Sequence, residues 1–371
     1  MLLAITVYNG RSFVPACLTS AKLLEQHTAE IDVLILDDCS PEEGFSAFLE
    51  QHCVERGFIY YRTPRNLGIV RNVNMGLLAA LEGGYDFVII SNSDVVYSKQ
   101  TVDHLLAAYN SNPGIGSVTG FSNNVSIFSI PNVDPDLHLS KQASVDWVAE
   151  SLARQFKGVA VDVPAGISFC ILIPASVIQT VGLMDPVFGR GYCEETDWTL
   201  RSLARGYRIT LAPAAFVYHR GRGSTVAAGM VSGGHSTVPE NEAVIDFRYP
   251  LFRDQVNAFV RGGIYDELKT TPVDLLLRVA NVQFGHDVQI SGAVEVGDAK
   301  RVICRVPSDM NEVTISYLGF ETRLKLKKGM QPLEVIRKFF IDDTSKTSTN
   351  AATNPLNLPI PLGTAAYPLY V

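Results

Sequence analysis

The feature that most constrains the fold is a regular alternation of strand-like and helix-like segments over the first 110 residues. Four short apolar runs, rich in β-branched and aromatic residues, are typical of buried strands, and they cover residues 2–7, 31–36, 58–61 and 86–90. Segments with the period of a helix separate them, at residues 12–26, 43–55 and 69–83. Strands that are apolar almost throughout and alternate with helices predict a parallel sheet covered on both faces.

Polar residues follow each of the four expected strands. These polar segments occupy residues 6–10, 37–40, 63–66 and 92–94. In open α/β sheets, ligands bind in the crevice at the carboxyl ends of the strands. We therefore expect the four segments to converge on one binding crevice.

The remainder of the chain divides into parts of different character. We expect a polar loop over residues 121–145 and, over 221–239, a Gly- and Ser-rich segment that forms a mobile lid or a linker. A helix is expected over 247–263, and short alternating segments over 282–328 predict a small antiparallel β unit. The expected organisation is a ligand-binding domain, a helical connector, a small β-rich accessory domain and an extended tail, over residues 1–240, 241–281, 282–343 and 344–371.

Composition and charge exclude several classes of protein. The chain of 371 residues is 47% hydrophobic and 19% charged, which is typical of soluble globular proteins with a full core. It carries 31 Lys and Arg against 38 Asp and Glu, a net charge of −7, so it lacks the basic excess of a nucleic-acid binder. The six cysteines are scattered without a C-x-x-C pair, which favours free thiols in a reducing compartment.

No apolar run reaches the roughly 18 residues that indicate a transmembrane helix. The first residues lack the basic region of a signal peptide, and they fit a buried strand better. We therefore expect a cytoplasmic protein. Peripheral contact with the inner face of the membrane and contact with a second copy of the chain both stay open.

A lone carboxylate, Asp94, follows the fourth expected strand within the polar stretch SNSD. A divalent metal that bridges two phosphates needs hard oxygen ligands on a rigid backbone, and it leaves several positions to phosphate and water. Asp94 fits that need, and an ordinary turn cap is the alternative. After the second strand, Asp37 and Asp38 fit hydrogen bonds to a nucleotide base or ribose. A helix-cap cluster is the alternative there.

Two arginines, Arg65 and Arg71, flank an expected helix start, and asparagines are interleaved with them. Gly68 permits a close approach of the backbone to a ligand. Guanidinium groups beside a helix N-terminus form a ready anion site. A solvated helix face is the alternative.

Three carboxylates crowd the segment EETDW, at Glu194, Glu195 and Asp197. Acidic residues favour a helix N-terminus, which is a structural reason for the cluster. Crowding also raises the pKa of at least one of them, as a general base that works near neutral pH requires. On a helix Glu194 and Asp197 share a face, and Glu195 points about 100° away, so we expect different roles for them.

A histidine, His219, follows a later expected strand and is itself followed by two arginines that alternate with glycines. A structural role is the ordinary interpretation of a lone histidine. Because Arg220 and Arg222 make an anion-facing loop plausible, His219 is also a candidate second metal ligand.

Taken together and in this order, the motifs resemble the inverting, GT-A-fold glycosyltransferases of family 2, which include bacterial rhamnosyl- and galactosyltransferases. The resemblance covers about residues 1–225. Its motifs are T-x-Y-N at 6–9, D-D-x-S at 37–40, R-N-x-G at 65–68 with R-N at 71–72, N-S-D at 92–94, the apolar strand with Gly166, E-E-T-D-W at 194–198 and H-x-x-x-x-S at 219–224. It implies an α/β fold with a mixed, mostly parallel GT-A sheet flanked by helices, followed by a smaller C-terminal β-rich region.

The resemblance also implies a role for each candidate residue. Glu195 would be the catalytic base, with Glu194 beside it and Asp197 as a competing base. Asp94, with His219, would hold Mn²⁺ or Mg²⁺ on the diphosphate of the donor. The nucleotide-sugar itself would be bound by Thr6, Tyr8, Asn9, Asp37, Asp38, Arg65, Asn66, Gly68, Arg71, Asn92, Ser93, Gly166, Arg220 and Arg222. The implied donor is a UDP-sugar, or else a dTDP- or GDP-sugar, and the implied acceptor is a hydroxyl of a glycan, a lipid-linked saccharide or a protein.

Two departures from the family pattern affect these roles. Asn92 replaces the first acid of the D-x-D motif, which would lower the affinity for metal. Glu195 replaces the Asp of an E-D pair, and the extra methylene moves the carboxylate outward. A catalytically degenerate GT-A-like binding or scaffold module is therefore the alternative function. A nucleotidyltransferase is disfavoured, because residues 8–13 lack the required glycine-rich loop.

Overall fold

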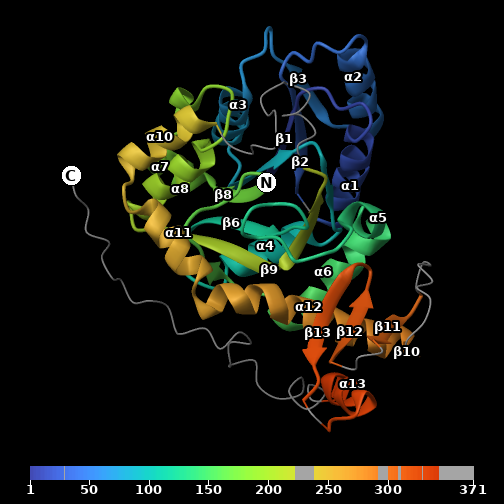
Figure 1. Ribbon diagram of the computed structural model, residues 1–371. Helices are drawn as coiled ribbons and strands as arrows, with labels where there is room; N and C mark the ends of the chain where they lie inside the picture. The colour runs from blue at the N-terminus through green and yellow to red at the C-terminus, as the bar shows by residue number, and fades with distance from the viewer. Residues whose placement is uncertain (29, 222–237, 291–299, 308–310, 328, 342–371) are drawn as a thin grey trace. The chain divides into compact units, whose positions relative to one another are not determined.

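The computed structural model describes residues 1–371 except 29, 222–237, 291–299, 308–310, 328 and 342–371 (Figure 1). The described chain forms two compact units. The first comprises residues 1–128 and 140–261, and the second comprises residues 129–139 and the described residues from 262 onward. The expected lid or linker falls mostly outside the described residues, and the expected tail wholly so.

The first unit contains the parallel core that the sequence predicts. Its strands are β1 (Leu2–Val7), β2 (Asp32–Asp37), β3 (Ile59–Arg62) and β4 (Phe87–Asn92). They pair in parallel in the order β3-β2-β1-β4. The helices between them are α1 (Val14–His27), α2 (Phe45–Arg56) and α3 (Ile69–Glu82). The alternation read from the sequence is confirmed, with α2 beginning two residues later than expected.

The same sheet continues beyond β4 as a mixed sheet. Its further strands are β5 (Val95–Tyr97), β6 (Ile115–Phe121), β7 (Val161–Asp162), β8 (Cys170–Pro174) and β9 (Arg208–His219). The strand β8 pairs antiparallel with both β4 and β6, and β9 pairs in parallel with β6. The long strand β9 has a register shift against β6 between Gly120 and Phe121. The mixed α/β architecture implied by the family resemblance is present.

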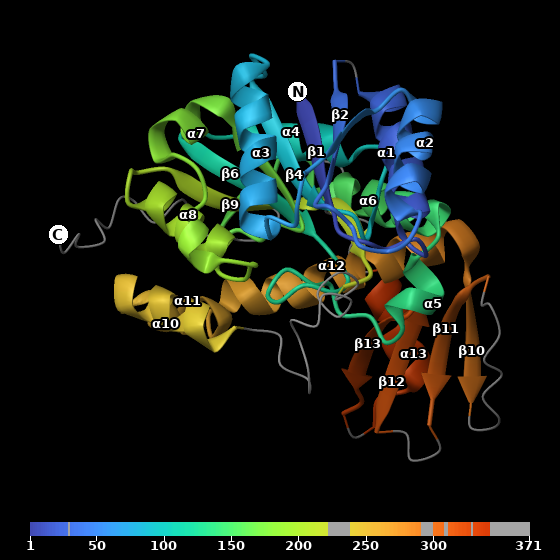
Figure 2. The ribbon, with the colours of Figure 1, turned by 90° about the horizontal axis from the view of Figure 1, so that it is seen from above.

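Helices cover both faces of this sheet (Figure 2). Those after β5 are α4 (Thr101–Tyr109), α6 (Gln142–Phe156), α7 (Ala175–Val181), the 3₁₀ turn η1 (Pro186–Phe188), α8 (Glu194–Leu203), α10 (Pro239–Arg248) and α11 (Phe252–Val260). The polar loop expected over 121–145 is shorter than predicted, because α6 already begins at Gln142. No described helix is long and apolar enough to cross a membrane.

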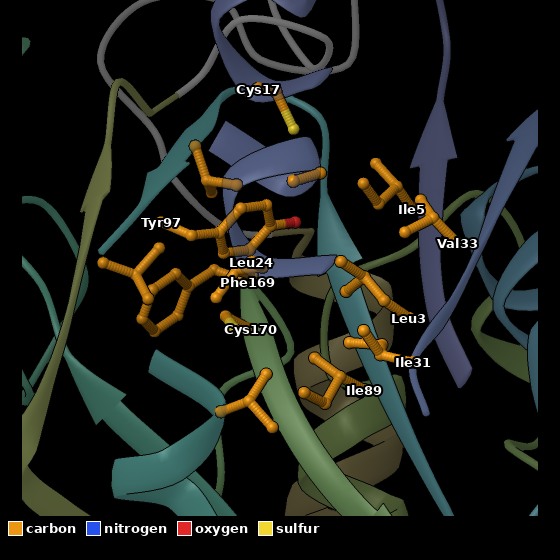
Figure 3. Packing of buried hydrophobic residues seen from close by; sticks show 14 of the residues in the cluster. Leu3, Ile5, Cys17, Leu24, Ile31, Val33, Ile89, Tyr97, Phe169 and Cys170 are labelled. Carbon is orange, nitrogen blue, oxygen red and sulfur yellow. The ribbon is translucent and has the colours of Figure 1, made fainter. Parts of the chain in front are cut away.

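The core forms two layers, one on each face of the sheet. Along β1, Leu3 and Ile5 pack into a cluster with residues of α1 and α2, whereas Leu2 and Ala4 pack into one with residues of α3, α7 and α8. The alternation follows from the period of two along a strand. Figure 3 shows part of the first cluster, including Leu3 and Ile5. Full burial of each such Leu or Ile side chain stabilises the fold by about 1.5–3 kcal/mol.

The second unit joins a small sheet to three helices. Its strands are β10 (His286–Ile290), β11 (Val302–Val306), β12 (Glu312–Tyr317) and β13 (Phe320–Lys325), and its helices are α5 (Pro135–Leu139), α12 (Gly263–Phe284) and α13 (Pro332–Ile341). Strands β11, β12 and β13 pair antiparallel, but β10 pairs in parallel with β11. The expectation of a purely antiparallel unit is wrong at this pair, because alternation along a strand does not reveal the direction of its neighbour.

Candidate active site

The ends of three of the parallel strands lie side by side at one edge of the sheet. Thr6 of β1 lies opposite Asn92 of β4 on one side, and Val7 lies opposite Asp37 of β2 on the other. The hydroxyl of Thr6 donates a hydrogen bond to the carbonyl oxygen of Ser91 at 3.3 Å. The carboxyl ends of β4, β1 and β2 therefore present their polar side chains at the same level of the sheet.

The carboxylate of Asp37 is completely buried and bonded within the fold. One oxygen accepts from the amide and hydroxyl of Ser40 at 2.9 and 2.6 Å, and the other accepts from Ser46 Oγ at 2.6 Å and from the hydroxyl of Tyr60 at 2.9 Å. Asn9, with a left-handed φ of 57°, reinforces this turn, because its amide donates to Ser40 Oγ at 2.8 Å. The sequence could not show that Asp37 accepts four hydrogen bonds from three residues of the fold, and these bonds give it a structural role.

Asp38 ties the end of β2 to the start of α3. Its oxygens accept from the amides of Leu67 and Gly68 at 2.7 and 2.8 Å. Gly68 has a φ of 80°, and a Cβ placed there would lie 2.9 Å from the carbonyl oxygen of Gly189. Glycine is required at 68 for both reasons. The structure therefore brings the loop before α8 directly against the N-terminus of α3.

The two expected anion-binding arginines are exposed on that helix start. Within the described residues, the guanidinium groups of Arg65 and Arg71 have no ion pair and no hydrogen bond, so both remain available to an anionic ligand. Asn66 is exposed as well, and its side-chain oxygen accepts from the amide of Gly68 at 3.0 Å. Tyr8 is half-buried just after β1.

Asp94 and His219 meet between β4 and the end of β9. His219 Nε2 lies 3.2 Å from Asp94 Oδ1, and both side chains are nearly buried. His219 Nδ1 lies 2.8 Å from the carbonyl oxygen of Asn124, which can only accept, so Nδ1 carries a proton. In a neutral ring the Nε2 lone pair would then face a carboxylate. A proton or a metal cation between them removes that repulsion, and an outer hydrogen bond of this kind is typical of metal-ligating histidines.

Burial and the carboxylate of Asp94 have opposite effects on the pKa of His219. Burial favours the neutral ring and lowers the pKa, but the hydrogen bond to Asp94 and the charge of Asp94 outweigh it and raise the pKa above the ordinary value. Asn92 is half-buried beside the pair, with its Nδ2 3.5 Å from His219 Nε2. Ser93 is buried between Asn92 and Asp94. Residues 92–94 therefore supply one amide, one hydroxyl and one acid to this corner.

Two other candidates, Arg220 and Gly166, contact mainly other groups of the fold. The backbone amide of Arg220 donates to the carbonyl oxygen of Asp94 at 2.9 Å, and its guanidinium lies 5.7 Å from the ring centroid of Phe13. A Cβ at Gly166 would lie 2.9 Å from Ile171 Cδ1 and 3.1 Å from Thr199 Cγ2, so this glycine packs against side chains of the core. Arg222 lies outside the described residues.

Asp197 is an ion-paired anchor. Arg201 Nε donates to Oδ2 at 2.8 Å, and Oδ1 accepts from Arg248 Nη1 at 2.8 Å and from the hydroxyl of Tyr249 at 2.9 Å. The side chain is fully buried. Both oxygens of Asp197 already accept hydrogen bonds from side chains of the fold, which disfavours Asp197 as the catalytic base.

In the part of the chain that the structure describes, Glu194 and Glu195 lack the ion pairs that Asp197 makes. Within the described residues, Oε2 of each is shielded from solvent and has no hydrogen-bond partner. Burial, followed by repulsion from Glu195, raises the pKa of Glu194 well above the ordinary value, and burial also raises the pKa of Glu195. The two carboxylates titrate as a pair that holds a proton more tightly than free glutamates do. A buried carboxylate oxygen without a donor is suited to accepting a proton.

Sequence reasoning missed the residues that hold these groups in place. Arg201 lies four residues after Asp197, a spacing that would have identified it as a partner. Arg248 and Asn124 contact the site across 51 and 95 residues of chain. No local pattern in the sequence indicates such contacts.

Comparison with known proteins gives one family match. The family model "Glycosyl transferase family 2" matches residues 3–145. No curated protein matches the chain.

Three solved structures are similar to this chain at low identity. A crystal structure of GalNAc-T7 with UDP, GalNAc and Mn²⁺ is 15% identical, with a TM-score of 0.47, over 74% of this chain and 54% of that one. The mannosyltransferase PcManGT from Pyrobaculum calidifontis, in complex with GDP-Man and Mn²⁺, is 12% identical, with a TM-score of 0.43, over 76% and 79%. S. aureus TarS 1–349 is 14% identical, with a TM-score of 0.41, over 75% and 80%. The alignment with GalNAc-T7 thus spans about half of that protein.

The matched residues contain β1 to β4, Asp94 and the turn that Asp38 anchors, whereas the acidic motif on α8 and His219 at the end of β9 lie beyond them. Over residues 3–145, which are less than half of the chain, the protein is therefore similar to glycosyl transferase family 2, and these residues lie in a mixed α/β domain.

Proposed function

We propose that the protein is a metal-dependent inverting glycosyltransferase. It moves a sugar from a nucleotide-diphosphate sugar to a hydroxyl of a saccharide, a lipid-linked molecule or a protein. The observation that carries the proposal is the contact of 3.2 Å between Asp94 Oδ1 and His219 Nε2 at the carboxyl end of the sheet. A proton or a metal cation between these two nearly buried groups removes the repulsion between them, and the proposal assigns that place to a metal ion.

The residues at this corner fit Mn²⁺ or Mg²⁺. Asp94 and His219 would hold the ion, and the side-chain oxygen of Asn92 is a third candidate ligand. Within the described residues no group of three or more His, Cys, Asp and Glu side chains could hold a metal. Such a site fits an ion that takes its remaining ligands from the diphosphate and water. When bound, the ion would offset the negative charge of the departing diphosphate.

The donor would lie along the carboxyl ends of β1, β2 and β4. Thr6 and Tyr8 line the nucleoside pocket in this proposal. Arg65 and Arg71, whose guanidinium groups have no partner among the described residues, attract the anionic part of the donor. Because their oxygens are used internally, Asp37 and Asp38 act mainly by fixing the shape of the pocket.

Glu195 is the base in this proposal. It takes the proton of the acceptor hydroxyl while that oxygen attacks the anomeric carbon from the face opposite the diphosphate. The bond between the anomeric carbon and the diphosphate oxygen breaks, and its electron pair leaves with the nucleoside diphosphate. A single displacement of this kind inverts the anomeric centre. Glu194 shares the proton with Glu195, and Asp197 holds α8 in place through its arginines.

Nucleotide-dependent melting tests the binding half of the proposal. The midpoint is measured with UDP, GDP and dTDP, each with and without Mn²⁺. At least one nucleotide should raise it by several degrees only when Mn²⁺ is present, since a ligand that binds only the folded state stabilises it. In the Asp94→Ala variant, the part of this midpoint shift that depends on Mn²⁺ should disappear.

A nucleotide shift that is equal with and without Mn²⁺, and unchanged in Asp94→Ala, would return Asp94 to the role of a turn cap. No shift with any nucleotide would favour the alternative of a degenerate binding or scaffold module, which the neutral Asn92 at the first D-x-D position supports.

A further inference from the structure

The segment before α8, residues 188–193, has a strained backbone. We call it the acidic loop, because it leads directly into Glu194 and Glu195. Tyr192 and Cys193 follow one another with φ values of 70° and 75°. Residues with side chains rarely adopt this left-handed conformation, and two in succession persist only where surrounding contacts hold them.

One side of the acidic loop packs against the start of α3. A Cβ at Gly191 would lie 2.2 Å from Ile69 Cγ2, and one at Gly68 would lie 2.9 Å from the carbonyl oxygen of Gly189. The loop therefore has no room to move toward α3. This contact alone does not fix the direction of its carbonyl groups.

The other side is held by one side chain from α10. Asn241 Nδ2 lies 2.9 Å from the carbonyl oxygen of Phe188, 2.7 Å from that of Gly191 and 2.9 Å from that of Tyr192. Asn241 is 9% exposed. Two amide hydrogens thus serve three carbonyl oxygens that all turn toward the same nitrogen. Only a donor at this position can satisfy a loop folded in this way.

The far end of α10 holds the other side of the two glutamates. Arg248 and Tyr249 bond to Asp197, which lies on the first turn of α8. Residues of α10 therefore form hydrogen bonds to the chain both before and after Glu194 and Glu195. Of these residues, Asn241 is the one that bonds directly to a residue with strained backbone, Tyr192.

We infer that Asn241 is a positioning residue, which holds the acidic loop so that Glu195 meets the acceptor hydroxyl in the reacting geometry. The inference rests on the proposed function of Glu195 as base. Asn241 acts through the loop carbonyls and the short chain that links them to Glu195. A loss of Asn241 should therefore affect the chemical step and leave donor binding largely intact.

Steady-state kinetics of the Asn241→Asp variant test the inference, with release of nucleoside diphosphate from the donor sugar as the assay. The substitution keeps the shape of the side chain but replaces the donating nitrogen by an oxygen that the three carbonyls repel. We expect kcat to fall about 100-fold, because small displacements of a reacting group have effects of that size. The KM for the donor should stay within about threefold.

Two further variants separate positioning from general damage. The neighbouring Glu240 is exposed, and Glu240→Gln should leave kcat unchanged. Asn241→Ala removes the hydrogen-bond donor without adding a charge, and it should lower kcat as Asn241→Asp does. Both Asn241 variants are compared at temperatures below their melting midpoints, so that only folded protein contributes.

A double variant tests whether Asn241 acts through Glu195. If it does, Asn241→Asp should cause little further loss of activity in a Glu195→Gln background, since residues that act as a unit are not additive. An unchanged kcat in folded Asn241→Asp, or a full further loss in the double variant, would overturn the inference. Full activity in Glu195→Gln alone would instead overturn the proposed base, and the inference with it.

Discussion

At the scale of single residues, the three acids of the EETDW segment have different surroundings within one turn of helix. Asp197 balances Arg201 and Arg248, whereas an oxygen of Glu194 and one of Glu195 are buried without a donor among the described residues. The sequence showed the crowding but not the partners, so it left Asp197 open as a base. Their surroundings differ only in the folded protein, because one partner of Asp197, Arg248, lies on α10, far along the chain.

The buried Glu194 should cost the protein stability at neutral pH. Its pKa is raised in the folded state, chiefly by burial, so the folded protein binds more protons than the unfolded chain in the range between the ordinary and the raised pKa. Stability from this group is therefore present at low pH and is lost as pH rises through that range.

We expect Glu194→Gln to raise the melting midpoint at pH 7–8, by about 3 °C or more, because a gain of about 1 kcal/mol shifts the midpoint by that amount. The gain should shrink toward the pH at which an ordinary glutamate is protonated. A midpoint difference that does not vary with pH would show that Glu194 is not a buried ionising group.

At the scale of elements, the acidic loop connects the start of α3 to the start of α8. Asp38 fixes the amides at 67 and 68, Gly68 contacts Gly189, and Asn241 holds the opposite side. The individual strands and helices around this loop were mostly predictable from apolar periodicity. The contacts between them were not, since the sequence showed that Gly68 permits close approach but not what approaches it.

A pair of glycine substitutions tests this contact. Gly68 has φ 80° and ψ 157°, which suits glycine almost alone, and it contacts the loop backbone. Gly84 has a φ of 69°, and a Cβ there would have nothing within 4 Å. We expect Gly84→Ala to lower the free energy of unfolding by about 1 kcal/mol and Gly68→Ala to lower it by about 3 kcal/mol.

Gly68→Ala should also reduce the rate of donor hydrolysis, whereas Gly84→Ala should not. Chemical denaturation and the hydrolysis assay measure the two effects on the same samples. Equal losses of stability in both variants, with normal rates, would mean that the contact with Gly189 is unimportant.

At the scale of the whole molecule, the first unit carries all of the candidate active-site residues that the structure describes. Its fold class followed from the sequence, because buried parallel strands with helical connections leave few other architectures. The parallel pairing of β10 with β11 could not be predicted from the sequence, because the alternation of buried residues is the same in parallel and antiparallel pairs. The helix α10 crosses the expected domain limit at residue 240, and it lies in the first unit, where Asn241 bonds to the acidic loop.

We propose that the first unit transfers a sugar with Glu195 as base. The most direct test measures release of nucleoside diphosphate from UDP-, GDP- and dTDP-sugars in the presence of Mn²⁺, because slow hydrolysis needs no acceptor. Wild-type protein should hydrolyse at least one donor, and Glu195→Gln should lose about 10²–10⁴-fold in rate while it still binds the nucleotide. Asp197→Asn should lower the melting midpoint but keep the pH profile of the wild type. Two results would contradict this proposal. One is that Glu195→Gln hydrolyses the donor at the wild-type rate. The other is that Asp197→Asn remains folded but no longer hydrolyses it.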